Sequence, residues 1–321
     1  MQVKKIITQR NYLDAAYMDI VYEWEDIFRD MLALDFSFDN TKRKNKRVLK
    51  IPYLSNLFTT WDNAIKFDLY IGDTAGMNKK NIIPIIIDFY ANDKSLEMFF
   101  RCYRRHKLVI VSSFEVYHYL KSHNCPFNIA HLPLSIPDKY RISKDSFHEK
   151  KYDLILMGRQ NNMLMQFLNN YKMRNVDFSY VYVKQENGHF RYYTSEGQYV
   201  GDADTRSKYI DMMRKARVGF WSTPGMDGGE QYTNGFNQVT PRFLEYIACG
   251  CHIVARYPQN EDTMYYNIGT ITPSIESYDE FESFLNKAIN TPVDYEKYAN
   301  YLSNHYTSNR VLQLEQIIRE L

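Results

Sequence analysis

The sequence predicts an α/β protein made of two Rossmann-like halves with mainly parallel sheets. The chain of 321 residues is long enough for two domains of ordinary size. Short apolar runs typical of buried strands alternate with amphipathic stretches at helical spacing. This alternation occurs twice, on either side of a charged connector at residues 134–150. We therefore expect an N-terminal domain at residues 1–140, a C-terminal domain at residues 141–305, and a closing helix at residues 306–321 that could pack back on the N-terminal domain.

In the first half, the apolar runs predict strands at Lys5–Thr8, Asp68–Ile71, Ile82–Ile87, Leu108–Val111 and Asn128–Pro133. Helical spacing predicts helices between them at Asp19–Leu32, Lys94–Arg105 and Phe114–His123. In the first of these helices the apolar residues recur at positions 20, 24, 27, 28 and 31, which places them on one face.

In the second half, strands are predicted at Tyr152–Met157, Phe178–Val183, Val218–Ser222 and His252–Ala255. Helices are predicted at Met163–Lys172, Thr205–Ala216, Pro241–Cys249, Tyr278–Asn290 and Arg310–Leu321. The polar, aromatic and glycine-bearing segment Gln185–Gly201 indicates a hairpin or an excursion from the sheet, and Thr223–Val239 indicates a polar loop.

The composition is that of a globular protein, with 45% hydrophobic and 24% charged residues. A net charge of +2 argues against a sequence-independent grip on nucleic acid, which needs a broad basic field. Lys42–Lys50 and Arg101–Lys107 are nevertheless local basic clusters. Each is either a solvated loop or helix end, or a patch for anionic lipid head groups or a phosphate-bearing acceptor.

No apolar run approaches the roughly 18 residues that a membrane span needs. The start of the chain, Met1–Ile7, is too short and too polar for a signal peptide. The four cysteines form no CxxC pair, and the eight histidines fit no zinc spacing. We expect a reduced cytoplasmic protein, either free or peripheral at the inner face of the membrane, that requires no metal and no cofactor.

The segment that carries most chemistry lies around residue 240. Thr240 suits the N-cap of a helix and Pro241 its first position, so the helix begins abruptly after a long loop. Its free N–H groups, with Arg242 beside them, are suited to bind an anion. Glu245 lies four residues beyond Pro241, roughly 6 Å along the same face. Its carboxylate could accept both hydroxyls of a ribose; the alternative is an ordinary capped amphipathic helix.

The stretch Phe243–Ala255 resembles the part of nucleotide-sugar-dependent GT-B glycosyltransferases that reads roughly R-x-x-E-x-x-A-x-G-x-P-V-V-A. Further segments are similar to other parts of that family in the same order. The family's last N-domain unit, its interdomain crossover, its strand followed by Gly-Arg and its C-terminal helix are matched by Leu108–Ser113, His131–Asp138, Leu154–Arg159 and Asn304–Leu314. The resemblance covers about residues 105–321.

This resemblance implies a GT-B fold, in which two Rossmann-like domains face each other across a cleft. It also implies transfer of a sugar from a nucleotide diphosphate sugar, UDP- or GDP-linked, to a saccharide or lipid-linked saccharide, as in the biosynthesis of surface polysaccharides such as capsule or O-antigen. By the resemblance, Glu245 binds the ribose of the donor. The residues that would bind or approach the diphosphate are Gly158, Arg159, Thr240, Pro241 and Arg242.

The sequence departs from the family pattern at two positions. Retaining members carry a glutamate eight residues before the ribose glutamate, where this chain has Asn237. They also carry a lysine about five residues after Gly-Arg, where this chain has Asn161–Leu164. Retaining and inverting mechanisms therefore both stay open.

An inverting transferase needs a general base near the anomeric carbon of the sugar. Carboxylates at the carboxyl ends of N-domain strands are candidates, because those ends would face the cleft. Asp14, Asp73 and Asp88 occupy such places, and each could instead cap a turn or a helix. We choose Asp73 and Asp14 as the catalytic candidates, with Asp73 favoured because small residues flank it. His131 at the end of a strand is interpreted as structural.

Competing interpretations also follow from the sequence. Asp202-Ala203-Asp204 is a D-x-D pair, as in metal-dependent transferases, but no apolar strand precedes it, so we interpret it as a helix N-cap. A nucleotide-sugar epimerase or hydrolase on the same scaffold would use the same donor residues. A non-catalytic GT-B-like scaffold subunit is a third possibility.

Overall fold

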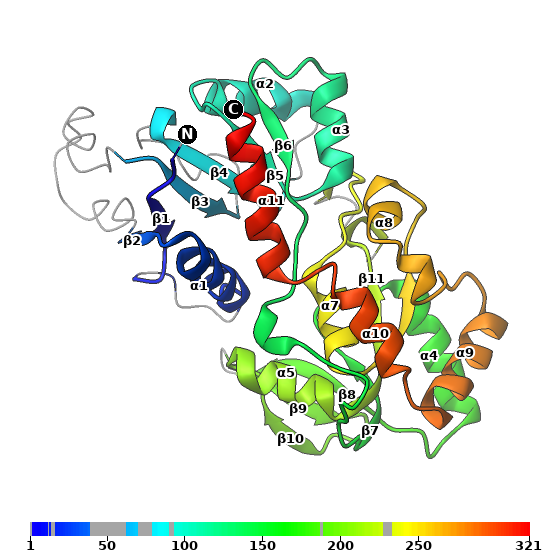
Figure 1. Ribbon diagram of the computed structural model, residues 1–321. Coiled ribbons are helices and arrows are strands. Elements are labelled where there is room, and N and C mark those ends of the chain that lie inside the picture. Colours follow the sequence, from blue (N-terminus) through cyan, green and yellow to red (C-terminus); the bar gives the residue numbers. More distant parts are fainter. Residues whose placement is uncertain are drawn as a thin grey trace. The chain divides into compact units, whose positions relative to one another are not determined.

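The computed structural model describes residues 2–11, 13, 17–38, 62–69, 79–89, 93–186, 189–226 and 233–321. The chain divides into two units (Figure 1). The N-terminal unit comprises Met1–Asp138 and Tyr306–Leu321, and the C-terminal unit comprises Lys139–His305. Each unit holds a six-stranded, mostly parallel sheet flanked by helices. The predicted α/β class with two Rossmann-like domains is confirmed.

The sheet of the N-terminal unit is parallel throughout. Its strands are β1 (Lys5–Thr8), β2 (Asp35–Phe38), β3 (Ala64–Asp68), β4 (Ile82–Ile86), β5 (Val109–Val111) and β6 (Ile129–His131). They lie in the order β2-β1-β3-β4-β5-β6. The chain passes from β1 outward to β2 and then returns to the other side of β1, so the strand order reverses between β1 and β3. Such a reversal is where open α/β sheets bind ligands.

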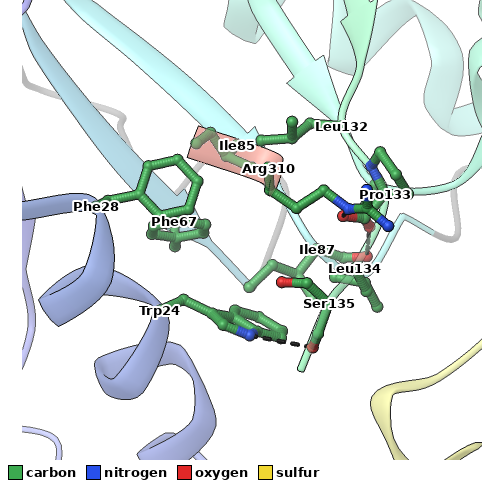
Figure 2. A pocket seen from close by; sticks show the side chains of 11 residues that line it. Trp24, Phe28, Phe67, Ile85, Ile87, Leu132, Pro133, Leu134, Ser135 and Arg310 are labelled. Carbon is green, nitrogen blue, oxygen red and sulfur yellow. Dashed lines mark hydrogen bonds between the residues drawn. The ribbon is translucent and has the colours of Figure 1, made fainter. Parts of the chain in front are cut away.

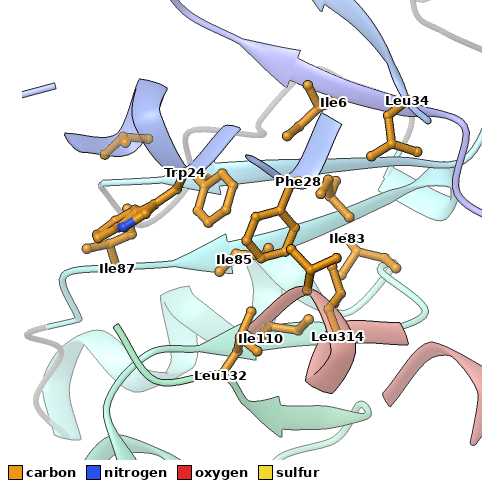
Figure 3. Packing of buried hydrophobic residues seen from close by; sticks show 14 of the residues in the cluster. Ile6, Trp24, Phe28, Leu34, Ile83, Ile85, Ile87, Ile110, Leu132 and Leu314 are labelled. Atoms are coloured by element: carbon orange, nitrogen blue, oxygen red, sulfur yellow. The ribbon is translucent and has the colours of Figure 1, made fainter. Parts of the chain in front are cut away.

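Helices cover both faces of this sheet, and they are α1 (Asp19–Leu32), α2 (Asp93–Tyr103), α3 (Phe114–Ser122) and α11 (Thr307–Arg319). One face is covered by α1 and α11, whose apolar side chains meet those of the strands (Figure 3). Trp24 and Phe28 of α1 and Leu314 of α11 are buried there. The core of the N-terminal unit thus joins segments from opposite ends of the sequence.

Polar contacts hold α11 in place beside the segment that follows β6. Ser308 donates from its backbone N and its Oγ to the carboxylate of Asp138, at 2.9 and 2.7 Å. Arg310, which is only 5% exposed, donates from Nε to the carbonyl oxygen of Pro133 at 3.1 Å. The helix begins at Thr307, three residues before its predicted start.

The predicted strand at Asp68–Ile71 was wrong in position. The strand β3 ends at Asp68, and residues 70–71 lie outside the described part of the chain. The reason is a charged pair inside the strand. Lys66 and Asp68 alternate with apolar Ile65 and Phe67, and the Lys66 Nζ lies 3.2 Å from Asp68 Oδ1 with both side chains buried. Because the two charges neutralise each other, both side chains can be buried in the strand. The sequence pattern alone indicates a polar connection at these residues.

The C-terminal unit has the strands β7 (Tyr152–Leu156), β8 (Tyr180–Glu186), β9 (His189–Thr194), β10 (Tyr199–Asp202), β11 (Ala216–Ser222) and β12 (His252–Arg256). Their order is β10-β9-β8-β7-β11-β12. The strands β8, β7, β11 and β12 are parallel, and β9 and β10 extend this sheet in antiparallel fashion. The hairpin predicted within Gln185–Gly201 is confirmed. The strand order reverses between β7 and β11.

Within its described residues, the C-terminal unit has the helices α4 (Asn162–Arg174), α5 (Arg206–Arg214), α7 (Pro241–Ala248), α8 (Glu261–Tyr265), α9 (Tyr278–Asn290) and α10 (Tyr295–Leu302). Short 3₁₀ turns among the described residues are η3 (Lys79–Asn81), η4 (Asp138–Tyr140), η5 (Pro224–Met226) and η6 (Ile268–Thr270). Leu164 and Leu168 of α4 pack with Phe281 and Leu285 of α9 against one face of the sheet. No helix within the described residues is long and apolar enough to cross a membrane.

The D-x-D pair does not cap a helix, contrary to the prediction. The N-cap of α5 is Thr205, whose Oγ1 accepts from the backbone N of Lys208 at 3.3 Å. Asp202 ends β10 and accepts from the Tyr199 hydroxyl at 2.9 Å, while Asp204 pairs with Lys208 at 2.9 Å. Both carboxylates are therefore used in surface contacts beside the helix rather than at its cap.

Candidate functional site

The candidate site lies at the carboxyl edge of the C-terminal sheet, where the strand order reverses between β7 and β11. Gly158 and Arg159 follow β7, and Thr223 follows β11. The connection from β11 to the parallel strand β12 includes α7, so the start of this helix lies at the same edge. Three segments that lie far apart in the sequence therefore meet at one edge of the sheet.

Arg242 in the first turn of α7 lies against the residues that follow β7. Its Nη1 donates to the carbonyl oxygen of Arg159 at 3.4 Å. Gly158 adopts a φ of +63°, and a Cβ atom there would lie 2.4 Å from Arg242 Nη2. Glycine is needed at position 158 both for its left-handed backbone and for the close approach of the guanidinium. The structure thus brings together three of the predicted donor-binding residues.

The start of α7 has the predicted backbone but not the predicted cap. Thr240 is the N-cap residue, with extended backbone angles, and Pro241 occupies the first turn. The Oγ1 of Thr240, however, accepts a hydrogen bond from Trp221 Nε1 at 3.0 Å. None of the described side chains caps the helix. The N-terminal end of α7 therefore keeps its partial positive charge at the edge of the sheet.

Glu245, the predicted ribose ligand, is only 3% exposed and lies in an internal ion pair. Its Oε1 lies 2.6 Å from Arg206 Nη1, and its Oε2 accepts from the Tyr209 hydroxyl at 3.2 Å. Burial, followed by the charge of Glu245, raises the pKa of the Tyr209 hydroxyl above its usual range. The phenol therefore stays protonated and donates, which fixes the orientation of the Glu245 side chain.

Sequence reasoning missed the contribution of Arg206 and Tyr209. Both come from α5, a helix that was interpreted only as amphipathic. One signal was available: Arg206 follows the N-cap directly, where the helix dipole disfavours a cation. A cation at that position indicates an anionic partner elsewhere in the fold, which is Glu245.

Asn161 ties the start of α4 to the segment that follows β11. Its Oδ1 accepts from the backbone N of Met163 and Leu164 at 3.0 and 3.1 Å, so it is a true N-cap. Its Nδ2 donates to the carbonyl oxygen of Met226. Arg256 at the end of β12 contacts the sulfur of Met163 and pairs with Glu276 at 3.2 Å. Asn161 and Arg256 are further polar groups at this edge that motif reasoning did not select.

Asn237 occupies the position where retaining transferases carry a glutamate. Its Oδ1 accepts from the Thr223 hydroxyl at 2.7 Å, and its Nδ2 donates to the carbonyl oxygen of Gly235 at 2.8 Å. Asn260 Nδ2 donates to the backbone oxygen of Asn237 at 3.2 Å. These contacts make Asn237 a fixed part of the loop between β11 and α7.

The catalytic candidates Asp14 and Asp73, and the basic patch Lys42–Lys50, lie outside the described residues. Asp88, the third carboxylate, is exposed after β4. His131 at the end of β6 is neutral at physiological pH, because burial lowers its pKa to about 4. Its Nε2 lies 3.2 Å from the carbonyl oxygen of Ser112, in agreement with a structural role.

A buried carboxyl group lies at the carboxyl end of β1 in the N-terminal unit. Glu25 of α1 is 2% exposed and accepts from the Thr8 hydroxyl at 2.6 Å and from Arg10 Nε at 3.1 Å. Burial raises the pKa of Glu25 to about 7, against the opposing hydrogen bonds. The sequence signal was its place on the apolar face of α1, between Trp24 and Phe28.

A small cavity of about 20 Å³ lies under α1 and α11 in the N-terminal unit (Figure 2). The indole Nε1 of Trp24 donates to the carbonyl oxygen of Ser135 at 3.2 Å beside it. The cavity has room for about one water molecule, so it is too small for a sugar. Within the described part of the chain, no group of three or more His, Cys, Asp or Glu side chains is arranged to hold a metal ion.

No family model and no curated protein matches the chain. Solved structures do match. AviGT4, a glycosyltransferase involved in avilamycin A biosynthesis, has a TM-score of 0.55 at 10% identity, with 99% of this chain and 97% of that chain covered. A putative UDP-N-acetylglucosamine 2-epimerase from Listeria monocytogenes has a TM-score of 0.52 at 10% identity, with 99% and 96% covered.

The GtfA/B complex has a TM-score of 0.52 at 10% identity, with 84% of this chain and 59% of that chain covered. The present chain therefore spans less than two thirds of that protein. At these identities the likeness concerns the fold, and it agrees with the two six-stranded, largely parallel sheets. The fold is GT-B, as the sequence resemblance implied.

Proposed function

We propose that this chain is a glycosyltransferase that moves a sugar from a nucleotide diphosphate sugar to a saccharide or lipid-linked saccharide acceptor. The observation that carries the proposal is the contact of Arg242 with Gly158 and Arg159 beside the uncapped start of α7. A guanidinium and a helix N-terminus at one sheet edge are strong recognition elements for a diphosphate. The likeness to glycosyltransferases such as AviGT4 supports the same activity.

Glu245 is the proposed ribose ligand, and Arg206 and Tyr209 are its positioning residues. Each carboxylate oxygen of Glu245 already accepts one contact, and each has capacity for a second. A ribose whose diphosphate lies at the start of α7 would place its hydroxyls about one helical turn further along, near Glu245. The contacts with Arg206 and Tyr209 hold the carboxylate of Glu245 in one orientation, in which its oxygens could accept two hydroxyl donors.

In the proposed reaction the acceptor hydroxyl bonds to the anomeric carbon of the sugar and the nucleoside diphosphate leaves. Arg242 and the positive end of α7 would stabilise the charge that develops on the leaving diphosphate. The protein therefore needs no metal for that task, and UDP- and GDP-sugars are the donors we propose. A base, for which Asp73 and Asp14 are our candidates, would take the proton of the acceptor hydroxyl if the reaction inverts the anomeric centre.

Two finer assignments belong to the same proposal. Surface polysaccharide synthesis would place the protein in the cytoplasm or at the inner face of the membrane. The basic residues of Lys42–Lys50 would then meet anionic lipid head groups. A second candidate function is nucleotide-sugar epimerisation or hydrolysis, which the likeness to the Listeria monocytogenes protein over nearly the whole of both chains favours. Release of free sugar or epimer from a donor without acceptor would support this second function.

Calorimetric titration with UDP and GDP tests the donor site. Arg242→Ala and Glu245→Ala should each weaken binding by about 2 kcal/mol, because charged contacts to phosphate or ribose are lost. Arg217→Ala is the matched control, since Arg217 is 41% exposed and pairs with Asp153 at 3.3 Å on another part of the unit. Equal affinity of the unaltered and Glu245→Ala proteins, with both folded by circular dichroism, would remove Glu245 from the ribose site.

A further inference from the structure

The antiparallel strands β8, β9 and β10 carry a row of tyrosines on one face of the C-terminal sheet. Tyr180 and Tyr182 come from β8, Tyr193 from β9 and Tyr199 from β10. Tyr182 is the direct cross-strand partner of Tyr193, which is in turn the partner of Tyr199. The centroids of successive rings lie 6.3, 6.3 and 5.8 Å apart. We call these four residues the tyrosine row.

The tyrosine row starts beneath a helix and ends in solvent. Tyr180 and Tyr182 pack at the margin of the core that α4 and α9 form on this face. Tyr193 is half-buried, and Tyr199 on the edge strand is 50% exposed. The opposite face differs, because Tyr192 points there and is completely buried. Side chains alternate between faces along β9, so only the face with Arg191 and Tyr193 continues the row.

Charged side chains surround the outer rings, and they neutralise one another. Glu186 pairs with Lys184 at 2.7 Å and with Arg191 at 3.6 Å, and Arg191 also lies 3.8 Å from Asp202. Asp202 lies 3.7 Å from Lys208, which also pairs with Asp204. A surface that binds an anionic polymer needs an excess of unpaired cations, and a surface that binds a basic partner needs an excess of unpaired anions. The balance of charge around the row fits a neutral ligand.

The polar atoms next to the rings are planar and already oriented. The Tyr193 hydroxyl donates to Glu186 at 2.5 Å, and the Tyr199 hydroxyl donates to Asp202 at 2.9 Å. Carboxylate and guanidinium groups can each take two neighbouring hydroxyls, and they retain capacity beyond these contacts. Aromatic rings offer flat apolar faces that suit the C–H faces of a pyranose ring. Rings flanked by oriented, bidentate polar groups are the chemistry that recognises sugars.

We propose that the tyrosine row is a binding surface for a neutral oligosaccharide chain, separate from the donor site. The row spans three strands, so successive sugar units would lie across the strands from Tyr199 toward Tyr182. The strands β8 and β7 are parallel, so the carboxyl end of β8, with Lys184 and Glu186, lies at the same sheet edge as Gly158. A glycan bound to the tyrosine row would therefore lie on the same unit as the donor site and would leave the donor site free.

Affinity electrophoresis in native gels that contain dextran, soluble starch, laminarin or galactomannan tests this surface. The unaltered protein should be retarded by at least one of these neutral polysaccharides. Tyr193→Ala and Tyr199→Ala should each weaken that retardation about five-fold, the effect of one lost aromatic contact. Tyr199→Phe should keep it, because the ring remains. Phe190→Ala is the matched control, since Phe190 is an exposed aromatic on the opposite face of the same strand.

Further outcomes separate the explanations. Lack of retardation in all four neutral gels would overturn the proposal, as would equal retardation of Tyr199→Ala and the unaltered protein. Retardation by heparin alone, lost in the same variants, would assign the face to an anionic polymer instead. UDP titration of every variant should match the unaltered protein, because the donor edge is unchanged. If neither the unaltered protein nor any variant bound UDP, this would contradict the proposed transferase but not the proposed glycan-binding surface.

Discussion

Glu25 shows how a single buried carboxyl group makes stability depend on pH. Its pKa is raised to about 7 in the folded chain, above the ordinary value of 4.5, because the side chain is buried. The folded state therefore binds the proton more tightly than the unfolded state does. The stabilisation is fully present below pH 4.5 and is lost as the pH rises through about 7. Arg10 and Thr8 reduce the effect, but they do not reverse it.

We predict that Glu25→Gln removes this pH dependence. The difference in unfolding free energy between the unaltered protein and the variant should change by about 3 kcal/mol between pH 4.5 and pH 8. Relative to the variant, the unaltered protein should be more stable at pH 4.5 than at pH 8. Urea unfolding followed by tryptophan fluorescence measures this, because Trp24 lies next to Glu25 on α1. A constant difference across that pH range would mean that Glu25 is already ionised in the fold.

At the scale of elements, α11 contributes to a core whose buried members outside this helix lie between Ile6 and Leu134. Leu314 of α11 is fully buried in that core, whereas Leu312 on the same helix is 57% exposed. We predict that Leu314→Ala lowers the free energy of unfolding by about 3 kcal/mol, since it leaves a cavity. Leu312→Ala has the same change in volume and helix propensity and should be almost neutral. Similar losses in denaturant unfolding for both variants would mean that α11 does not pack as described.

Helices with a regular apolar stripe could be predicted from the sequence, and the strand β3, which holds a buried pair of charges, could not. The bounds of α1 and α9 agree with the prediction, and α9 is further marked by a capping box of Ser277 and Glu280. The predicted bounds of β3 were wrong because the pairing of Lys66 with Asp68 can be recognised only in the folded structure. The strand β2 lies at the sheet edge, where half-exposed residues give no clear alternation. The short helices α8 and α10 were also missed.

The candidate site could be predicted in part. Thr240, Pro241 and Gly158 have local signatures, because a helix start and a left-handed backbone depend on neighbouring residues. The contact of Arg242 with Gly158 depends on the parallel pairing of β7 and β11, and it has no local signature. The pairing of Glu245 with Arg206 likewise depends on how α5 and α7 lie beside each other. Both contacts therefore needed the fold as well as the motif.

At the scale of the whole molecule, the two units have separate hydrophobic cores. All the residues that we propose for donor binding lie in the C-terminal unit. We predict that UDP at about a hundred times its dissociation constant stabilises that unit by about 2.7 kcal/mol. Hydrogen exchange should then slow in α7, β7 and β11, with α1 and β4 as internal controls. This slowing of hydrogen exchange by UDP should persist in EDTA. Its loss in EDTA would show that a metal contributes to UDP binding.

The return of α11 to the N-terminal unit also sets the order in which the chain can fold during synthesis. Residues 139–305 form one continuous stretch, so they can collapse as soon as they leave the ribosome. The first unit has its strands early but lacks the helix that covers Leu132 and Ile110 until residues 307–319 are made. Until then the apolar side chains that pack with Leu314 lack this cover, so we expect the second unit to complete its core before the first unit does.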